Sequence, residues 1–396
     1  MDYQNQIWDL SAGIELIGDL GYLLLFSAAV GIIAYILRQP LVLGFLVAGI
    51  LIGPFGPLNL IKDVTMLNNF SDIAIVLLLF GVGLTFPVSQ LKAIGKVGGA
   101  IAVIEVFAML GIGFGVAAIF GWSTTDAMFL AAALSISSTA IIVKVLEEMD
   151  VIEEPSSLLI IGVLVIEDLI AAILISTLHS SVLSGAFSFD QTLWKIGEIG
   201  AFIGGTVILG TFGMPKIFSL LSNLQRYEFT ILVALGTAFG LSFLSYELGF
   251  SAATGAFLAG VIIAGSRFSE DITNLITPIR EIFTAIFFVT IGALMDINII
   301  AQYWLPILII TLVTIVGKTL SVYAGVRLFQ LGPSNALGIG LSMAQLGEFS
   351  FIVLKVGQDL GATSAFLFPI VGMVVVLTTI FAPILIKKGT KMMVAY

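Results

Sequence analysis

Long apolar stretches, separated by short polar or Pro/Gly turns, make up most of this chain. A helix needs about 20 predominantly apolar residues to cross a bilayer. The pattern therefore predicts an all-α polytopic membrane protein. Its thirteen predicted transmembrane helices lie near residues 16–37, 40–61, 69–86, 96–120, 126–149, 155–181, 192–222, 226–246, 250–266, 276–295, 302–329, 334–356 and 362–387. No low-complexity linker interrupts the series, so we expect residues 1–396 to form a single transmembrane domain without a soluble regulatory domain.

Two of the predicted helices contain polar residues in the middle of an apolar segment. The fifth contains Ser135-Ile-Ser-Ser-Thr139, and the twelfth contains Ser342-Met-Ala-Gln-Leu-Gly-Glu348. Each is the fifth helix of its half if the chain divides into six helices, a linker helix and six more. Paired interruptions at matching positions are typical of inverted-repeat transporters. We therefore expect a six-plus-six inverted repeat with halves at roughly 16–181 and 226–387, a linker helix at 192–222, and two interrupted helices.

The basic residues indicate an orientation. If the N-terminus is outside, twelve of the 16 Lys and Arg residues fall in inside segments and three, including Lys355, in outside segments. Cytoplasmic loops carry an excess of Lys and Arg. We therefore expect a multi-pass protein of the inner (plasma) membrane with its C-terminus in the cytoplasm. Asp72 falls at the start of the third predicted helix, where we expect it to be solvated.

Composition excludes several classes of protein. The chain is 59% hydrophobic and only 10% charged, whereas a soluble domain carries about 25% charged residues. It has no Cys and one His, which excludes disulfides, thiol redox chemistry and Cys-based or multi-His metal sites. The net charge of −9 is not that of a nucleic-acid-binding protein, which needs a clustered basic face. We expect a non-enzyme without a cofactor, whose partners are the lipid bilayer and small ions.

The sixth predicted helix carries two adjacent carboxylates, Glu167 and Asp168, near its middle. A charge at the bilayer centre costs roughly 3 kcal/mol on insertion scales. Ion or proton transport is the usual reason to retain such a pair. Glu105, Lys318 and Glu348 also lie well inside predicted helices. A structural ion-pair cluster is the alternative, although buried pairs are weak evidence for stability.

The positions of these charges suggest separate roles. Neighbouring residues on a helix point in different directions, so Glu167 and Asp168 cannot both face one partner. We expect one to bind the transported ion and the other to neutralise Lys318. Glu105 would pair with Lys318 or support the interrupted helices. Buried carboxylates of this kind can load and release protons near physiological pH, as cation–proton exchange requires.

The second interruption offers further candidates. Glu348, Gln345 and Ser342 lie where the twelfth predicted helix is interrupted. Glu348 would cap exposed backbone N–H groups there and act in gating, or would contact the ion directly.

Six motifs spread over nearly the whole chain resemble the monovalent cation:proton antiporter-2 family, which includes sodium/proton exchangers and the membrane domain of glutathione-gated potassium efflux proteins. They are Gln39–Pro54, Leu77-Leu-Leu-Phe-Gly-Val-Gly-Leu84, Ser137-Ser-Thr-Ala140, Gly255-Ala-Phe-Leu-Ala-Gly260, Phe287-Phe-Val-Thr-Ile-Gly292 and Ala344-Gln-Leu-Gly-Glu-Phe-Ser-Phe351. The last is close to the form in the potassium efflux proteins.

This resemblance implies a homodimer of thirteen-helix protomers, each with a dimerisation domain and a mobile core domain. It also implies that the two interrupted helices cross beside the ion site. It implies that Asp168 binds a cation or protons alternately and that Lys318 matches the family's core-domain lysine. It places Ser137, Ser138 and Thr139 on an unwound segment whose backbone carbonyls help to hold a dehydrated cation, with Na⁺, Li⁺ or K⁺ as the substrate exchanged for H⁺.

Position 167 departs from the pattern. The exchangers thought to be electrogenic carry Asp-Asp and the potassium efflux proteins carry Gln-Asp, whereas this chain has Glu167-Asp168. A sodium/proton exchanger is therefore the first interpretation. A K⁺/H⁺ efflux antiporter membrane domain, a channel-like conductance and a non-transporting membrane sensor on the same fold stay open, and an intramembrane enzyme is the weakest alternative.

Overall fold

The computed structural model describes residues 3–37, 39–85, 91–184, 189–222, 227–248, 250–266 and 268–394. Within these residues, regular secondary structure is α-helical apart from one isolated bridge between Ser137 and Leu346. In chain order the helices are α1 (Tyr3–Ile36), α2 (Leu41–Ile52), α3 (Val64–Leu84), α4 (Leu91–Ile119), α5 (Thr124–Leu134), α6 (Thr139–Glu148), α7 (Pro155–Ser184), α8 (Phe189–Ser222), α9 (Tyr227–Glu247), α10 (Ala252–Ala264), α11 (Ser269–Ala293), α12 (Ile297–Gln302), α13 (Trp304–Leu328), α14 (Pro333–Ser342), α15 (Glu348–Asp359) and α16 (Leu367–Val394).

Length and composition show which helices can cross a membrane. Among the described residues, 8 helices are long and apolar enough to do so, and the shorter helices α2, α5 and α10 are also apolar. The apolar character follows from the runs of Leu, Ile, Val, Phe and Ala that the sequence places in these segments. The chain is therefore an all-α, multi-pass membrane protein.

The second predicted helix is shorter than expected. Residues 40–61 are helical only as far as Ile52, the last residue of α2. The sequence Gly53-Pro-Phe-Gly-Pro57 follows, and a proline lacks the N–H that would continue the helical hydrogen bonds. The chain then turns, and Asp63 caps α3 by accepting from the backbone N–H groups of Thr65 and Met66. Because α3 starts at Val64, Asp72 lies in its third turn and not at its start, contrary to the prediction.

Both predicted interruptions are present. The fifth predicted helix is divided into α5 and α6 by residues 135–138, and the twelfth into α14 and α15 by residues 343–347. Residues 135–138 and 343–347 are buried. Polar backbone groups at these depths need partners within the protein, because the bilayer offers none.

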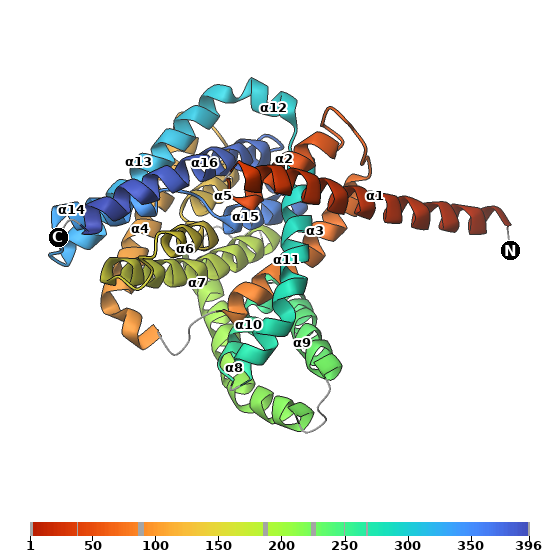
Figure 1. Cartoon of the computed structure of the whole chain (residues 1–396), viewed down its shortest axis with the longest axis horizontal. Helices are drawn as coiled ribbons and strands as arrows, with labels where there is room; N and C mark the ends of the chain where they lie inside the picture. The colour runs from red at the N-terminus through yellow and green to blue at the C-terminus, as the bar shows by residue number, and fades with distance from the viewer. Residues whose placement is uncertain are drawn as a thin grey trace.

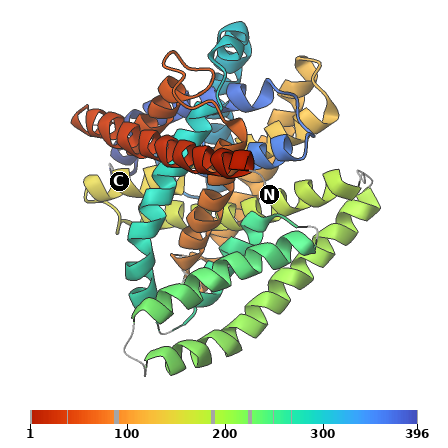
Figure 2. The same ribbon diagram turned by 90° about the vertical axis from the view of Figure 1, so that its right-hand side faces the viewer.

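The helices pack in two groups (Figure 1). The first group, which we call the glycine-packed group, comprises α1–α3 and α9–α11, and its main contacts are between α3 and α10, α3 and α11, α2 and α11, and α9 and α10. The second, which we call the charged group, comprises α4–α7 and α12–α16, with α4 against α5, α7 and α13, and α14 against α13 and α16. Helix α8 packs against α7 and α10 and so touches both groups; Figure 2 shows it with α9 at one edge of the molecule.

Backbone-to-backbone contacts hold the glycine-packed group together. A Cβ atom added to Gly49 of α2 would lie 2.0 Å from the carbonyl oxygen of Val289 in α11. A Cβ atom at Gly83 of α3 would lie 2.2 Å from the carbonyl oxygen of Phe257 in α10. Small residues at helix crossings allow this close approach in membranes.

The charged group differs in its interior. In the described part of the chain, the charged side chains that are buried all belong to this group: Glu105, Asp126, Glu167, Asp168, Lys318 and Lys355. A hydrogen bond joins α10 to α7 across the two groups, since the hydroxyl of Thr254 donates to the carbonyl oxygen of Ala172 at 3.1 Å.

Candidate functional site at the crossing of the interrupted helices

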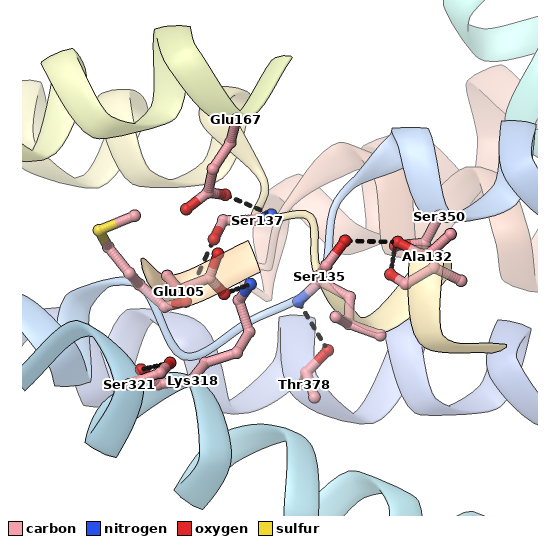
Figure 3. A network of polar contacts seen from close by, with 12 residues as sticks. Glu105, Ala132, Ser135, Ser137, Glu167, Lys318, Ser321, Ser350 and Thr378 are labelled. Atoms are coloured by element: carbon pink, nitrogen blue, oxygen red, sulfur yellow. Dashed lines mark hydrogen bonds and ion pairs between the residues drawn. The ribbon is translucent and has the colours of Figure 1, made fainter. Parts of the chain in front are cut away.

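The two non-helical segments cross inside the charged group (Figure 3). Ser137 and Leu346 form an antiparallel bridge, and the backbone N–H of Gly347 donates to the carbonyl oxygen of Ile136 at 3.3 Å. A Cβ atom at Gly347 would lie 2.5 Å from the carbonyl oxygen of Ser137. The crossing therefore requires glycine at position 347. The prediction that the two interrupted helices cross is confirmed.

Side chains outside the predicted site support the crossing. Thr378 of α16 accepts a hydrogen bond from the backbone N–H of Leu346 at 3.3 Å, and Ser350 of α15 donates to the carbonyl oxygen of Ala133 at 2.6 Å. These bonds satisfy backbone groups that the interruptions leave free. Neither residue belongs to the site predicted from the sequence. Thr378 and its neighbour Thr379 interrupt the apolar first half of α16, and their hydroxyls were the available signal.

The two adjacent carboxylates of α7 bind different parts of the first interruption. Glu167 accepts from the backbone N–H of Ser137 at 2.9 Å, and Asp168 accepts from the hydroxyl of Thr139 at 3.1 Å. Both side chains are buried, with relative exposures of 1% and 4%. Thr139 is the first residue of α6, so Asp168 lies near a helix N-terminus, where the partial positive charge favours an anion.

Lys318 contacts neither of these carboxylates. Its ammonium group pairs with Glu105 of α4 at 2.5 Å, and both side chains are fully buried. The expectation that Glu167 or Asp168 neutralises Lys318 is therefore wrong, and the alternative of a Glu105–Lys318 pair is confirmed. The reason is that α13 packs on α4, while the Glu167 carboxylate is directed to the backbone N–H of Ser137.

Glu348 joins the second interrupted helix to the first. It is the first residue of α15, and its carboxylate accepts from the hydroxyl of Ser138 at 3.4 Å, a long hydrogen bond. The negative charge of Glu348 repels that of Asp168 and attracts the positive charge of Arg280 in α11. Glu348 thus lies between the site and the glycine-packed group.

The other two candidates of the second interruption have different surroundings. The hydroxyl of Ser342 donates back to the carbonyl oxygen of Gly338 at 2.9 Å, within its own helix, so it does not join the carboxylates. Gln345 is fully buried in the crossing segment, and neither polar atom of its side chain has a hydrogen-bond partner among the described residues.

This arrangement offers oxygen ligands in a buried setting. The Asp168 carboxylate and the Thr139 hydroxyl are the side-chain groups that could hold a cation, beside backbone carbonyls of the unwound segment. Carboxylate, hydroxyl and carbonyl oxygens suit hard cations and not soft transition metals. The same carboxylate can take up a proton instead.

Comparison with known proteins identifies the family. Residues 23–388 match the family described as sodium/hydrogen exchanger, transmembrane. The chain is 32% identical to YbaL of Escherichia coli (strain K12) over 348 residues, which cover 85% of this chain and 62% of YbaL. It is 28% identical to K(+) efflux antiporter 4 of Arabidopsis thaliana, with 96% of this chain and 64% of that protein covered. The chain thus spans less than two thirds of the length of these two relatives.

Other relatives are covered almost completely. The chain is 29% identical to a Na(+)/H(+) antiporter of Enterococcus hirae, with 94% of this chain and 98% of that protein covered. Its fold matches the structure of the sodium proton antiporter MjNhaP1 from Methanocaldococcus jannaschii at pH 8, with a TM-score of 0.77, 19% identity, and 96% and 99% of the two chains covered. The sequence match over residues 23–388 and this fold together show that the chain belongs to the sodium/hydrogen exchanger family of membrane proteins.

Proposed function

We propose that this protein exchanges a monovalent cation for protons by alternating access, with the two substrates competing for Asp168. The observation that carries the proposal is the setting of this carboxylate. It is buried, bound to the Thr139 hydroxyl, and adjacent to the crossing of two interrupted helices. A buried carboxylate without a cationic partner is costly. Binding of a cation or a proton would remove that cost, so either substrate would complete the site.

The surrounding charges support a single exchangeable site. Lys318 is already neutralised by Glu105, which leaves Asp168 available to a substrate. Glu167 holds the backbone of the first interruption and so positions Ser137, Ser138 and Thr139. Glu348 would act in gating, since it links the two interruptions through Ser138.

The architecture that goes with this function is a thirteen-helix protomer. We propose an inverted repeat with halves at 16–181 and 226–387 and with α8 as the linker helix. Matching contacts in the two halves support it, because α4 packs on α5 as α13 packs on α14, and α1 on α2 as α9 on α10. The glycine-packed group would be the dimerisation domain of a homodimer in the inner membrane, and the charged group the mobile core. The N-terminus would lie outside and the C-terminus in the cytoplasm.

The cation would be Na⁺ in the first instance, with Li⁺ and K⁺ as alternatives. Relatives named as Na(+)/H(+) antiporters and as K(+) efflux antiporters both match this chain. Each net charge moved gains about 2.3 kcal/mol per 100 mV of membrane potential. An exchanger that moves two protons per cation can therefore use the potential, whereas a one-to-one exchanger follows concentrations alone.

The experiment is a pH-dye assay in proteoliposomes, with Na⁺, K⁺ and Li⁺ titrated separately. The unmodified chain should show cation-driven proton movement, and Asp168→Asn should lose it. Asp63→Asn is the matched control, because asparagine also caps a helix and residue 63 lies in the turn before α3. Normal exchange by Asp168→Asn would overturn the assignment of the site. Cation flux without opposing proton movement would indicate a channel, and no flux of any kind would indicate a non-transporting sensor.

A further inference from the structure

A buried lysine in α15 binds an aspartate on the other helix group. The ammonium group of Lys355 donates to the carboxylate of Asp72 in α3 at 3.3 Å, and also to that of Asp359, one turn further along α15. The Lys355 side chain is 1% exposed, whereas that of Asp72 is 59% exposed. The bond to Asp359 stays within one helix, but the bond to Asp72 crosses from the charged group to the glycine-packed group.

The backbones of α3 and α15 are not closely packed beside this bond. Among the described residues, the extensive contacts of α3 are with α9, α10 and α11, and those of α15 are with α5, α7 and α16. No extensive helix pair joins α3 to α15. The ion pair is therefore a direct link between two helices whose backbones do not pack closely against each other. A lysine that is withdrawn from water is retained only where partners compensate its charge.

The position of the pair relative to the site suggests its role. Lys355 lies seven residues beyond Glu348 on the same helix, about 10 Å along its axis. The backbone N–H of Ser364, in the turn after α15, donates to Asp126 at 2.7 Å, so α15 ends at the face of the molecule where α5 begins. This is the outer face in the predicted orientation. The pair thus lies between Asp168 and that face, on the boundary between the two groups.

We propose that the Lys355–Asp72 ion pair is a latch that holds the two helix groups together at this face and must open before Asp168 can be reached from it. The proposal rests on the proposed function only in that alternating access requires such an opening. Removing either charge of the crossing bond should raise the fraction of molecules that are open at this face. Removing Asp359, which contacts the same lysine from within α15, should not.

A single cysteine can report on the boundary, because the chain has no Cys of its own. Ser176 of α7 is fully buried and its hydroxyl has no hydrogen-bond partner among the described residues, so Ser176→Cys breaks no bond described here. It lies one turn beyond Ala172, the residue whose carbonyl accepts from Thr254 of α10, and two turns beyond Asp168 on the same side of α7. Its rate of reaction with N-ethylmaleimide should follow the opening of this boundary.

The experiment measures that rate in membrane vesicles for Ser176→Cys alone and combined with each further change. Asp72→Asn and Lys355→Met should each raise it roughly fivefold, the effect of losing one partly exposed ion pair. Asp72→Glu should restore the slow rate, and Asp359→Asn should leave it unchanged. An unchanged rate in both Asp72→Asn and Lys355→Met would overturn the latch. So would equal acceleration by Asp359→Asn, because the effect would then come from α15 alone.

The labelling rate does not depend on transport. Repeating it with Asp168→Asn present separates the two proposals. If that variant still exchanges ions, the assignment of Asp168 fails while the latch is judged on labelling alone. If labelling fails to respond to Asp72→Asn and Lys355→Met while Asp168→Asn abolishes exchange, the latch fails and the assignment of Asp168 stands.

Discussion

In the glycine-packed group, α2 meets α11 and α3 meets α10 through backbone atoms, whereas the charged group encloses the buried charged side chains of the described chain. The first kind of contact permits almost no sliding, since the backbones already touch at Gly49 and Gly83. The second leaves polar atoms without hydrogen-bond partners among the described residues, namely Oε2 of Glu105, Oε1 of Glu167 and both polar atoms of Gln345. The unpartnered buried atoms of the glycine-packed group are neutral, in Asn68, Ser71 and Thr290. Among the described residues, only the charged group combines unsatisfied polar atoms with buried charges that can bind ions or protons. Close backbone contact also occurs in the charged group, between Gly340 of α14 and Thr319 of α13, so the buried charges are what distinguish that group.

The strongest test of the comparison removes one charge from the buried pair in the charged group. Lys318→Met leaves Glu105 buried without a partner, which should cost about 3–5 kcal/mol of stability. The combination of Lys318→Met with Glu105→Met should recover most of that loss, because no unpaired charge then remains. Thermal unfolding in detergent measures both variants. Equal destabilisation by the single and double variants would show that packing, and not charge, explains the site.

The next test concerns the glycine-packed group. Gly49→Ala adds a Cβ atom 2.0 Å from the Val289 carbonyl oxygen, so α2 and α11 must separate, at a cost of about 1–3 kcal/mol. Gly111→Ala in α4 is the matched control, because no atom lies within 4 Å of the added carbon there. Thermal unfolding should distinguish the two clearly. If Gly49→Ala is as stable as Gly111→Ala, close backbone contact does not define this group.

A smaller effect is expected from the support of the crossing. Thr378→Val removes the acceptor of the Leu346 N–H, at a cost of about 1 kcal/mol. Thr390→Val in the same helix removes only a bond to the carbonyl oxygen of Ile386, four residues before it. The first change should lower the melting temperature and the apparent cation affinity in the proteoliposome assay, and the second should leave the affinity unchanged. Equal affinity in both variants would mean that Thr378 has no part in the site.

The most subtle test separates the two adjacent carboxylates. Glu167→Gln keeps an oxygen that can accept from the Ser137 N–H but removes the charge. We expect exchange to persist with an altered charge stoichiometry or pH dependence. The response of exchange to an imposed membrane potential measures this. An identical response in the unmodified chain would show that Glu167 acts only through its hydrogen bond.

Local sequence signals were enough to predict both interruptions and the burial of the adjacent carboxylates. The polar residues Ser135–Thr139 and Ser342–Glu348 stand out in apolar segments, and a charge in the bilayer always requires an explanation. The early end of α2 could also have been predicted, because Gly53 and Pro54 mark it. Each of these signals involves residues close together in the chain.

The partner of Lys318 could not be predicted in the same way. Glu105 is 213 residues away in the chain, and several buried carboxylates were equally plausible partners. Lys318 pairs with Glu105 because α13 packs against α4 and because the Glu167 carboxylate accepts from the Ser137 N–H instead. Only the three-dimensional arrangement reveals these two contacts. The same holds for Asp72, which the sequence placed at a helix end and the structure places beside Lys355.

The crossing of the interrupted helices also has a consequence for how the protein is made. Ser137 and Met343, which meet there through a hydrogen bond, are separated by 206 residues, and Gly347 must lie against Ser137. During synthesis, α5, α6 and α7 therefore enter the membrane well before α14 and α15 exist. Until then, Glu167 and Asp168 lie in the bilayer beside the first interruption, which has not yet met the second. We expect this interval to be the stage of biogenesis at which the nascent chain depends most on the insertion machinery to keep these two carboxylates away from lipid.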